Sequence, residues 1–135
     1  MEVMLDMILG IESTAHTLSF GLVEGNGRAV PSVSDLFRPE EGGIHPREAA
    51  DHHSSVAGNL LSRVMMDNSL SSTDISAIAF SQGPGLGPCL RVGASVARAL
   101  SNSWKIPLIG VNHCVAHIEI GRSLTGCEDP VLLYV

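Results

Sequence analysis

The segment from Val111 to His117, V-N-H-C-V-A-H, holds the two residues whose spacing points most directly to chemistry. In a helix, His113 and His117 stand one turn apart on the same face, so both imidazoles can reach one metal ion. A metal centre needs a third and usually a fourth ligand. Cys114 stands where a zincin motif has its general-base glutamate. The spacing therefore leaves two interpretations open: half of a metal site, or two core or surface histidines.

A hydroxyl-rich turn near the start of the chain is a second candidate. Glu12, Ser13 and Thr14 stand at the end of a short apolar run at residues 7–12, and residues 18–23 alternate in the manner of a strand. These features predict a hairpin with a carboxylate at the mouth of its turn. The actin and sugar-kinase class holds phosphate at such a turn, and a plain polar hairpin turn is the alternative interpretation.

A glycine-rich loop, S-Q-G-P-G-L-G-P, is the third candidate, through Gly83, Gly85 and Gly87. It joins a predicted strand to a predicted helix, and backbone N–H groups at a helix N-terminus can bind an anion. The loop matches neither the P-loop nor the dinucleotide-binding pattern. A tight turn fixed by alternating glycine and proline is the other interpretation.

Hydrophobic patterning predicts the elements that position these residues. Pro31 indicates an edge strand because proline cannot donate to a central ladder, and Pro46 fits a first helical turn. His113 would follow the carboxyl end of a strand, where open α/β sheets gather ligands. The predicted strands are residues 7–12, 18–23, 29–37, 75–80 and 108–111, and the predicted helices are residues 47–68 and 90–103.

His52 and His53 lie near the start of the first predicted helix. Adjacent helical residues point about 100° apart, so these two side chains are not expected to share an ion easily. The sequence favours a hydrogen-bonding or capping role for them.

Composition indicates one globular domain. The chain has 135 residues, of which 44% are hydrophobic and 16% charged, and no apolar run approaches the roughly 20 residues of a transmembrane helix. No signal peptide is recognisable, so a cytoplasmic location is expected. The cysteines, Cys89, Cys114 and Cys127, have no C-x-x-C spacing, which predicts reduced thiols rather than disulfides or a thiolate zinc site.

The charge balance bears on the partners. The formal net charge is −6, and Lys105 is the only lysine. Such a chain lacks the basic patch with which a protein grips nucleic acid by itself. A nucleic-acid substrate would have to be held mainly by partners.

Four segments, taken in order, resemble a known family: G-I-E-S-T-A-H-T, G-G-I-H-P-R-E-A-A-D-H-H, F-S-Q-G-P-G-L-G-P-C-L-R and N-H-C-V-A-H. They are similar to the archaeal and eukaryotic catalytic subunit of the KEOPS complex, in the TsaD-like family of tRNA threonylcarbamoyladenosine synthases, long called O-sialoglycoprotein endopeptidases. The resemblance covers nearly the whole chain.

The resemblance implies an α/β fold of the actin-like ATPase (ASKHA, ribonuclease H-like) type, with a mixed sheet flanked by helices. It implies transfer of threonylcarbamoyl from an adenylate to the adenosine beside the anticodon of tRNA. The expected cofactors are one iron or zinc ion and, in the cleft between two lobes, ATP or threonylcarbamoyl-adenylate.

The resemblance also assigns residues. His113 and His117 match the family's metal-binding histidines, and Tyr134 resembles a tyrosine that approaches the metal. The candidates for contact with phosphate or the carbamoyl group are Glu12, Ser13, Thr14, Gly83, Gly85 and Gly87.

The family's Ser-Gly-Gly-Asn-Thr phosphate loop would follow Val135. Residues 1–130 are therefore expected to form the N-terminal actin-like lobe and residues 131–135 the first strand of a second, truncated lobe, which makes the piece inactive alone. The expected partners are the small dimerising subunit and small kinase of KEOPS-type assemblies, with tRNA bound through the complex and no membrane contact.

Three alternative functions remain. The chain could be a docking module of the same complex, or a non-catalytic paralogue, although such a paralogue lacks the H-x-x-x-H pair. A metalloprotease is disfavoured because the motif has no general-base glutamate.

Overall fold

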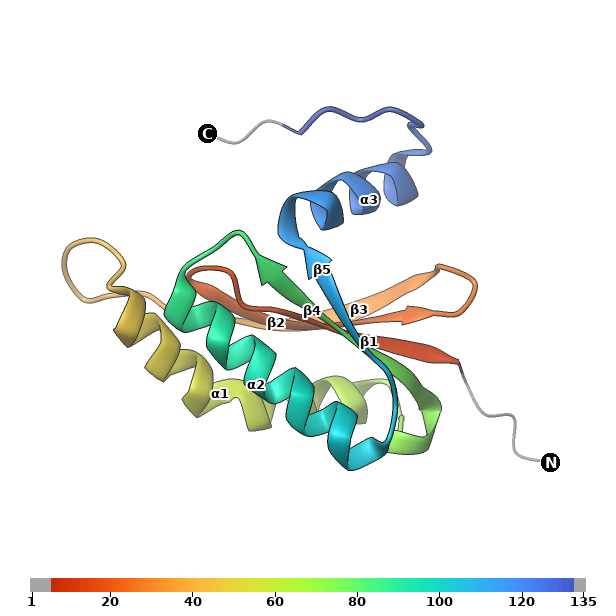
Figure 1. Ribbon diagram of the computed structural model, residues 1–135, viewed down its shortest axis with the longest axis horizontal. Coiled ribbons are helices and arrows are strands. Elements are labelled where there is room, and N and C mark those ends of the chain that lie inside the picture. Colours follow the sequence, from red (N-terminus) through yellow and green to blue (C-terminus); the bar gives the residue numbers. More distant parts are fainter. Residues whose placement is uncertain (1–5, 133–135) are drawn as a thin grey trace.

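The computed structural model describes residues 6–132 and shows one five-stranded mixed sheet with the strand order β3-β2-β1-β4-β5 (Figure 1). The elements are β1 (Met7–Glu12), β2 (Thr17–Glu24), β3 (Ala29–Leu36), α1 (Pro46–Asp67), a 3₁₀ turn (Ser72–Asp74), β4 (Ile75–Gly83), α2 (Gly87–Trp104), β5 (Leu108–Asn112) and α3 (His113–Thr125).

The topology brings the carboxyl ends of three strands to one edge of the sheet. Strands β1, β4 and β5 run parallel, while β2 and β3 run antiparallel to their neighbours in a meander from β1. Glu12 ends β1, Gly83 ends β4 and Asn112 ends β5. Ligands gather at such an edge in open α/β sheets. Pro31 lies in the edge strand β3, as its missing N–H predicts.

The core lies between one face of the sheet and the helices α1 and α2, whereas α3 lies beyond the other face (Figure 1). Burial alternates along β1, so Met7, Leu9 and Ile11 face the two helices. Leu60 and Val64, one turn apart on α1, pack into the same cluster. The 3.6-residue stripe of α1 and the two-residue period of the strands thus bury one continuous core.

Two boundaries differ from the sequence prediction by three residues, and the others by one residue at most. Strand β4 continues to Gly83, and α2 begins at Gly87 rather than at residue 90. Pro88 is compatible with the first helical turn, where its missing N–H costs no hydrogen bond, so the helix starts inside the glycine-rich segment. The strand expected at residues 131–135 lies mostly outside the described range, and that expectation stays a prediction.

None of the helices in residues 6–132 has both the length and the apolar character needed to cross a membrane.

Candidate functional site

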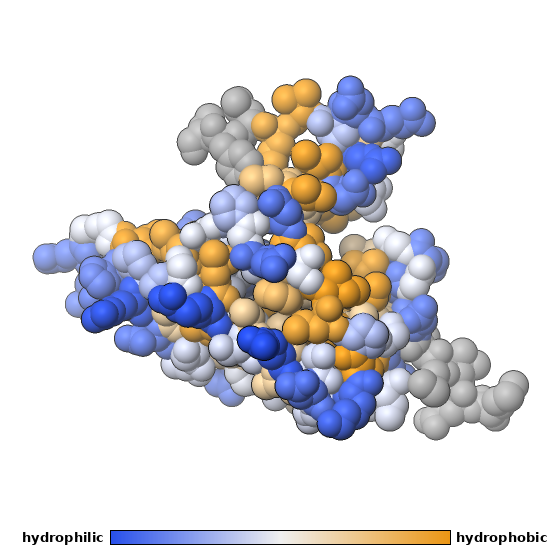
Figure 2. Space-filling view, viewed as in Figure 1, coloured by the Kyte–Doolittle hydropathy of each residue, from blue (hydrophilic) through white to orange (hydrophobic). Residues whose placement is uncertain are grey.

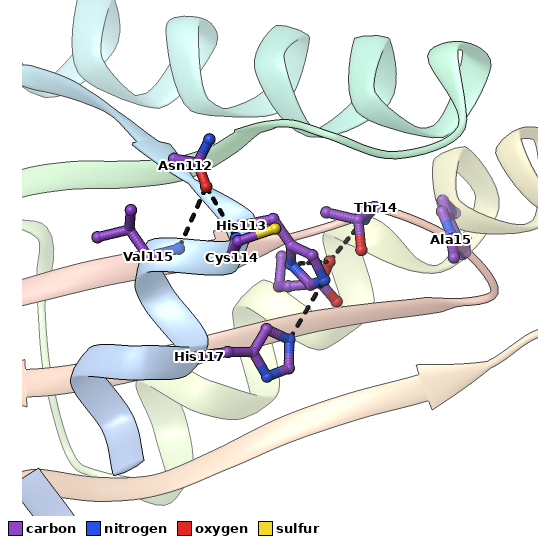
Figure 3. A network of polar contacts seen from close by, with 9 residues as sticks. Thr14, Ala15, Asn112, His113, Cys114, Val115 and His117 are labelled. Carbon is purple, nitrogen blue, oxygen red and sulfur yellow. Dashed lines mark hydrogen bonds and ion pairs between the residues drawn. The ribbon is translucent and has the colours of Figure 1, made fainter. Parts of the chain in front are cut away.

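The histidine pair lies at the start of α3, directly after β5. The side chain of Asn112 caps the helix: its Oδ1 accepts hydrogen bonds from the N–H groups of Cys114 at 2.9 Å and Val115 at 3.1 Å. His113 and His117 project from successive turns, and their rings meet edge to face with centroids 4.4 Å apart (Figure 3). The one-turn relationship predicted from the spacing is therefore present.

The distance between the two rings fits a shared metal ion. The Nε2 atoms of His113 and His117 are 3.2 Å apart. Two nitrogens bound at ~2.0–2.1 Å to one tetrahedral ion stand about 3.3–3.4 Å apart, so little movement would be needed. His117 is exposed and His113 is partly exposed, which leaves an approach for further ligands. Within residues 6–132, no cluster of three or more His, Cys, Asp or Glu side chains is suited to a metal.

Glu12 stands beside this pair at the end of β1. One carboxylate oxygen, Oε1, accepts the N–H of Thr14 at 2.6 Å and lies 3.9 Å from Nδ1 of His113. A carboxylate on the far side of a ligating imidazole orients the ring in many metal sites. The Nδ1 atom of His113 thus faces a carboxylate while its Nε2 faces the partner ring.

The hydroxyl-rich turn directs its side chains into the protein. Ser13 is 1% exposed and Thr14 is also buried. A Cβ on Gly93 of α2 would come 2.1 Å from the Ser13 hydroxyl oxygen, so the serine packs against the helix. Contact of Ser13 and Thr14 with phosphate stays a prediction, and with these side chains buried the backbone is the part of the turn able to make it.

The glycine-rich loop is bound to the same turn. The N–H of Leu86 donates to the carbonyl of Thr14 at 2.7 Å, and a Cβ on Gly85 would come 2.6 Å from that carbonyl oxygen. The backbone φ of Gly83 is 149°, a value that residues with a side chain rarely adopt. In the described structure no side chain caps the N-terminus of α2 at Gly87. The turn and the loop therefore form one wall beside the three strand ends, and anion binding by Gly83, Gly85 and Gly87 stays a prediction.

A hollow of about 470 Å³ opens between α3 and the sheet. Figure 2 shows hydrophobic residues where α3 rises from the sheet, and mostly hydrophilic ones over α1 and the loop before it. The floor contains the paired strand residues Gly10 and Gly21, whose missing side chains leave room. The lining also includes Glu12, His113, His117, Phe80 and Ile120. The histidine pair thus borders a largely apolar space.

The hydrogen-bonding role predicted for His52 and His53 is confirmed. The Nε2 atom of His52 is 2.7 Å from Oδ1 of Asp35, and Nε2 of His53 is 2.7 Å from the carbonyl oxygen of Ala15. The expected divergence of the two side chains is wrong, because their Nδ1 atoms are 3.1 Å apart. Their rotamers turn the rings together although the Cα–Cβ bonds diverge. The sequence offered no signal for Asp35 or Ala15 as partners.

Tyr134, the remaining metal-site candidate, lies outside the described residues.

Sheet order, helix placement and the position of the site define an α/β protein of the actin-like, ribonuclease H-like type, which confirms the predicted fold. Solved structures agree. YeaZ from Pseudomonas aeruginosa matches with a TM-score of 0.70 and 18% identity, covering 91% of this chain and 50% of that one. RuvC of Thermus thermophilus, solved with a Holliday junction substrate, matches with a TM-score of 0.52 and 12% identity, covering 93% of this chain and 83% of that one.

The particular family follows from sequence. The model of the TsaD family, tRNA N6-adenosine threonylcarbamoyltransferase, matches residues 31–135, and the chain belongs to that family. A transferase of that name from Staphylothermus marinus is 54% identical over 132 residues, covering 94% of this chain and 39% of the relative. A probable bifunctional tRNA threonylcarbamoyladenosine biosynthesis protein from Methanosarcina mazei is 52% identical over 131 residues, covering 95% of this chain and 24% of the relative. The chain thus spans well under half the length of these relatives.

Proposed function

We propose that this chain forms the metal-binding lobe of a tRNA threonylcarbamoyltransferase, which transfers threonylcarbamoyl from an adenylate to the adenosine beside the anticodon. The observation that carries the proposal is the pair of Nε2 atoms 3.2 Å apart at the carboxyl edge of the sheet, in a member of this transferase family.

In this mechanism His113 and His117 would hold one iron or zinc ion through their Nε2 atoms. Neutral imidazole suits both metals, and a metal bound there would polarise the carbonyl that the tRNA amine attacks. Glu12, whose Oε1 lies 3.9 Å from Nδ1 of His113, would orient that ring, and Asn112 fixes the helix end that carries both rings. Tyr134 and an aspartate from beyond this chain would complete the ligand set.

The nucleotide would lie against the wall formed by the hairpin turn and the glycine-rich loop. ATP or threonylcarbamoyl-adenylate carries phosphate, and the backbone N–H groups of Gly83, Gly85 and Gly87 suit phosphate or a developing oxyanion. Binding at the strand ends would place such a ligand near the histidine pair, because Glu12 belongs to the turn and lies beside His113.

We infer that residues 1–130 are the N-terminal lobe and that residues 131–135 begin a second one, since full-length relatives are much longer. A net charge of −6 favours tRNA binding through an assembly, with the small dimerising subunit and the small kinase as partners. The same lobe can serve for docking and for catalysis, so the docking alternative is compatible with this proposal.

Metal binding by the 135-residue chain tests the central assignment. His113→Ala and His117→Ala should each weaken the binding of zinc or ferrous ion by more than the roughly 10–100-fold that loss of an outer-shell partner costs. Titration calorimetry and metal analysis of the purified variants measure the change. His45→Ala, at an exposed position just before α1, is the matched control and should bind as the parent does.

The corresponding substitutions in a full-length relative should abolish tRNA threonylcarbamoylation, measured by mass spectrometry of tRNA nucleosides. Wild-type rates together with full metal content in both variants would refute the assignment. The 135-residue chain alone should show no turnover, because the proposed remaining ligands and most of the nucleotide site belong to the longer protein.

A further inference from the structure

The turn between β1 and β2 is held through three consecutive backbone carbonyls, each by a donor from a different part of the fold. Two donors are backbone N–H groups, and only the third is a titratable side chain, His53 of α1. The contacts are Leu86 N–H to Thr14 O at 2.7 Å, His53 Nε2 to Ala15 O at 2.7 Å and Phe37 N–H to His16 O at 2.8 Å.

His53 is the inner end of a continuous chain of hydrogen bonds. Asp35, on the edge strand β3, contacts Nε2 of His52 at 2.7 Å, and Nδ1 of His52 contacts Nδ1 of His53 at 3.1 Å. The chain ends at the carbonyl of Ala15. It therefore connects a surface carboxylate to the backbone of the turn.

Counting donors and acceptors assigns the protons in this series of hydrogen bonds. A carbonyl only accepts, so His53 carries its proton on Nε2, and as a neutral ring it accepts at Nδ1. His52 must then donate from Nδ1. Its Nε2 faces a carboxylate that also only accepts while ionised, so His52 must donate there too. Counted with Asp35 as the ionised carboxylate, these two hydrogen bonds place a proton on each ring nitrogen of His52.

His53 is the ring that stays neutral. It is fully buried, and this burial is the main cause that lowers the pKa of His53, outweighing the hydrogen bond to Ala15. The titratable groups that act on it are His52 on α1, Glu12 on β1 and His16 in the turn. A metal ion between the two rings is disfavoured, because burial of His53 closes the space that further ligands would need and residues 6–132 contain no three-residue ligand cluster.

We propose that His52 and His53 are a positioning pair, one imidazolium and one neutral imidazole, which couples the charge of Asp35 to the carbonyl of Ala15 and so fixes the β1–β2 turn. The importance of that turn for catalysis rests on the proposed function. The proton assignment and the fixing of the turn by His53 do not rest on the proposed function. Both are therefore tested without any measurement of transfer activity.

Long-range ¹H–¹⁵N spectra of the imidazoles at neutral pH test the proton assignment in the 135-residue chain. The parent should show His52 protonated on both nitrogens and His53 protonated on Nε2 alone. Asp35→Asn should convert His52 to a neutral ring, because an amide can donate to Nε2. Asp51→Asn removes an equal charge next to His52 in sequence, on the exposed side of α1, and should leave the parent pattern. A neutral His52 in the parent, or no change with Asp35→Asn, overturns the assignment.

Hydrogen exchange tests the hold on the turn. His53→Leu removes the donor to Ala15 at similar volume and should speed exchange of the Leu86 and Phe37 amides by roughly tenfold, the effect of about one lost hydrogen bond. His53→Gln can still donate and should restore most of the protection. Unchanged exchange in a folded His53→Leu overturns the positioning role. If that variant does not fold, the same two amides are compared between Asp35→Ala, which removes the partner of His52 Nε2 and should speed exchange, and Asp51→Ala. Equal rates in those two variants overturn the role as well.

Discussion

At the scale of single residues, the contact between Ser13 and Gly93 decides how closely α2 approaches the end of β1. The Ser13 hydroxyl is buried and, among the described residues, has no hydrogen-bond partner. A Cβ on Gly93 would stand 2.1 Å from that oxygen and 3.1 Å from the serine Cβ. The two small residues therefore pack together by shape alone, because the Ser13 hydroxyl makes no hydrogen bond in this contact.

This contact predicts a non-additive pair of substitutions. Gly93→Ala should lower the free energy of unfolding by about 1–3 kcal/mol, because the added methyl overpacks the interface. Ser13→Ala should be nearly neutral or stabilising, since it removes an unsatisfied hydroxyl. In the double variant most of the Gly93→Ala penalty should disappear, because the closer of the two clashing atoms is gone. Urea unfolding of the four proteins measures the cycle. Additive effects would show that the two residues are not in contact.

At the scale of elements, α3 depends on its first turn. None of its residues is buried, and its last turn ends at Gly126 in a left-handed conformation. Little packing therefore holds the helix that carries both histidines, and the Asn112 cap replaces some of that missing support.

Asn112→Ala should therefore weaken metal binding by His113 and His117, although it changes neither imidazole ring. Loss of an N-cap costs about 1 kcal/mol, which corresponds to about fivefold weaker binding of zinc if the helix must reform around the metal. Asn112→Ser keeps an oxygen for capping and should bind nearly as the parent does. Titration calorimetry compares the three proteins. Equal affinities for the alanine variant and the parent would mean that α3 is held by something other than its cap.

The elements themselves were largely predictable, because each follows from a local period. The short apolar run at residues 7–12, the alternation in residues 18–23 and the stripe through Leu60 and Val64 are local signals that tertiary contacts reinforced. The start of α2 at Gly87 was not predictable from the sequence. Glycine and proline in series indicate a turn unless packing holds the first turn of the helix.

The site was predictable only where its parts are close in sequence. His113 and His117 belong to one helix, so their spacing already places their rings together. The approach of Glu12 to His113 arises from parallel pairing of β1 with β4 and of β4 with β5, which joins residues about 100 positions apart. The link from Asp35 to His52 depends in the same way on α1 packing beside β3. No local pattern encodes such contacts.

At the scale of the whole molecule, His53 links protonation to folding, since its partners lie on separate elements that meet only in the native state. Burial lowers the pKa of His53 below its ordinary value of 6.5. On acidification the unfolded chain therefore takes up the proton first, and this favours unfolding. The contribution of His53 to stability is fully present above pH ~6.5 and is lost as the pH falls from there toward the lower pKa of the folded state.

The free energy of unfolding should accordingly fall on acidification more steeply in the parent chain than in His53→Gln, which keeps a donor for Ala15 but cannot take up the proton. The difference between the two proteins should be constant above pH ~7 and should move in favour of the variant as the pH drops below ~6.5. Urea unfolding at a series of pH values from 8 to 5 measures it. Ser54→Ala, on the exposed side of the same helix turn, should run parallel to the parent throughout. Parallel curves for His53→Gln and the parent would show that His53 binds protons equally in the folded and unfolded states. That result would contradict the burial of a neutral His53 in the fold.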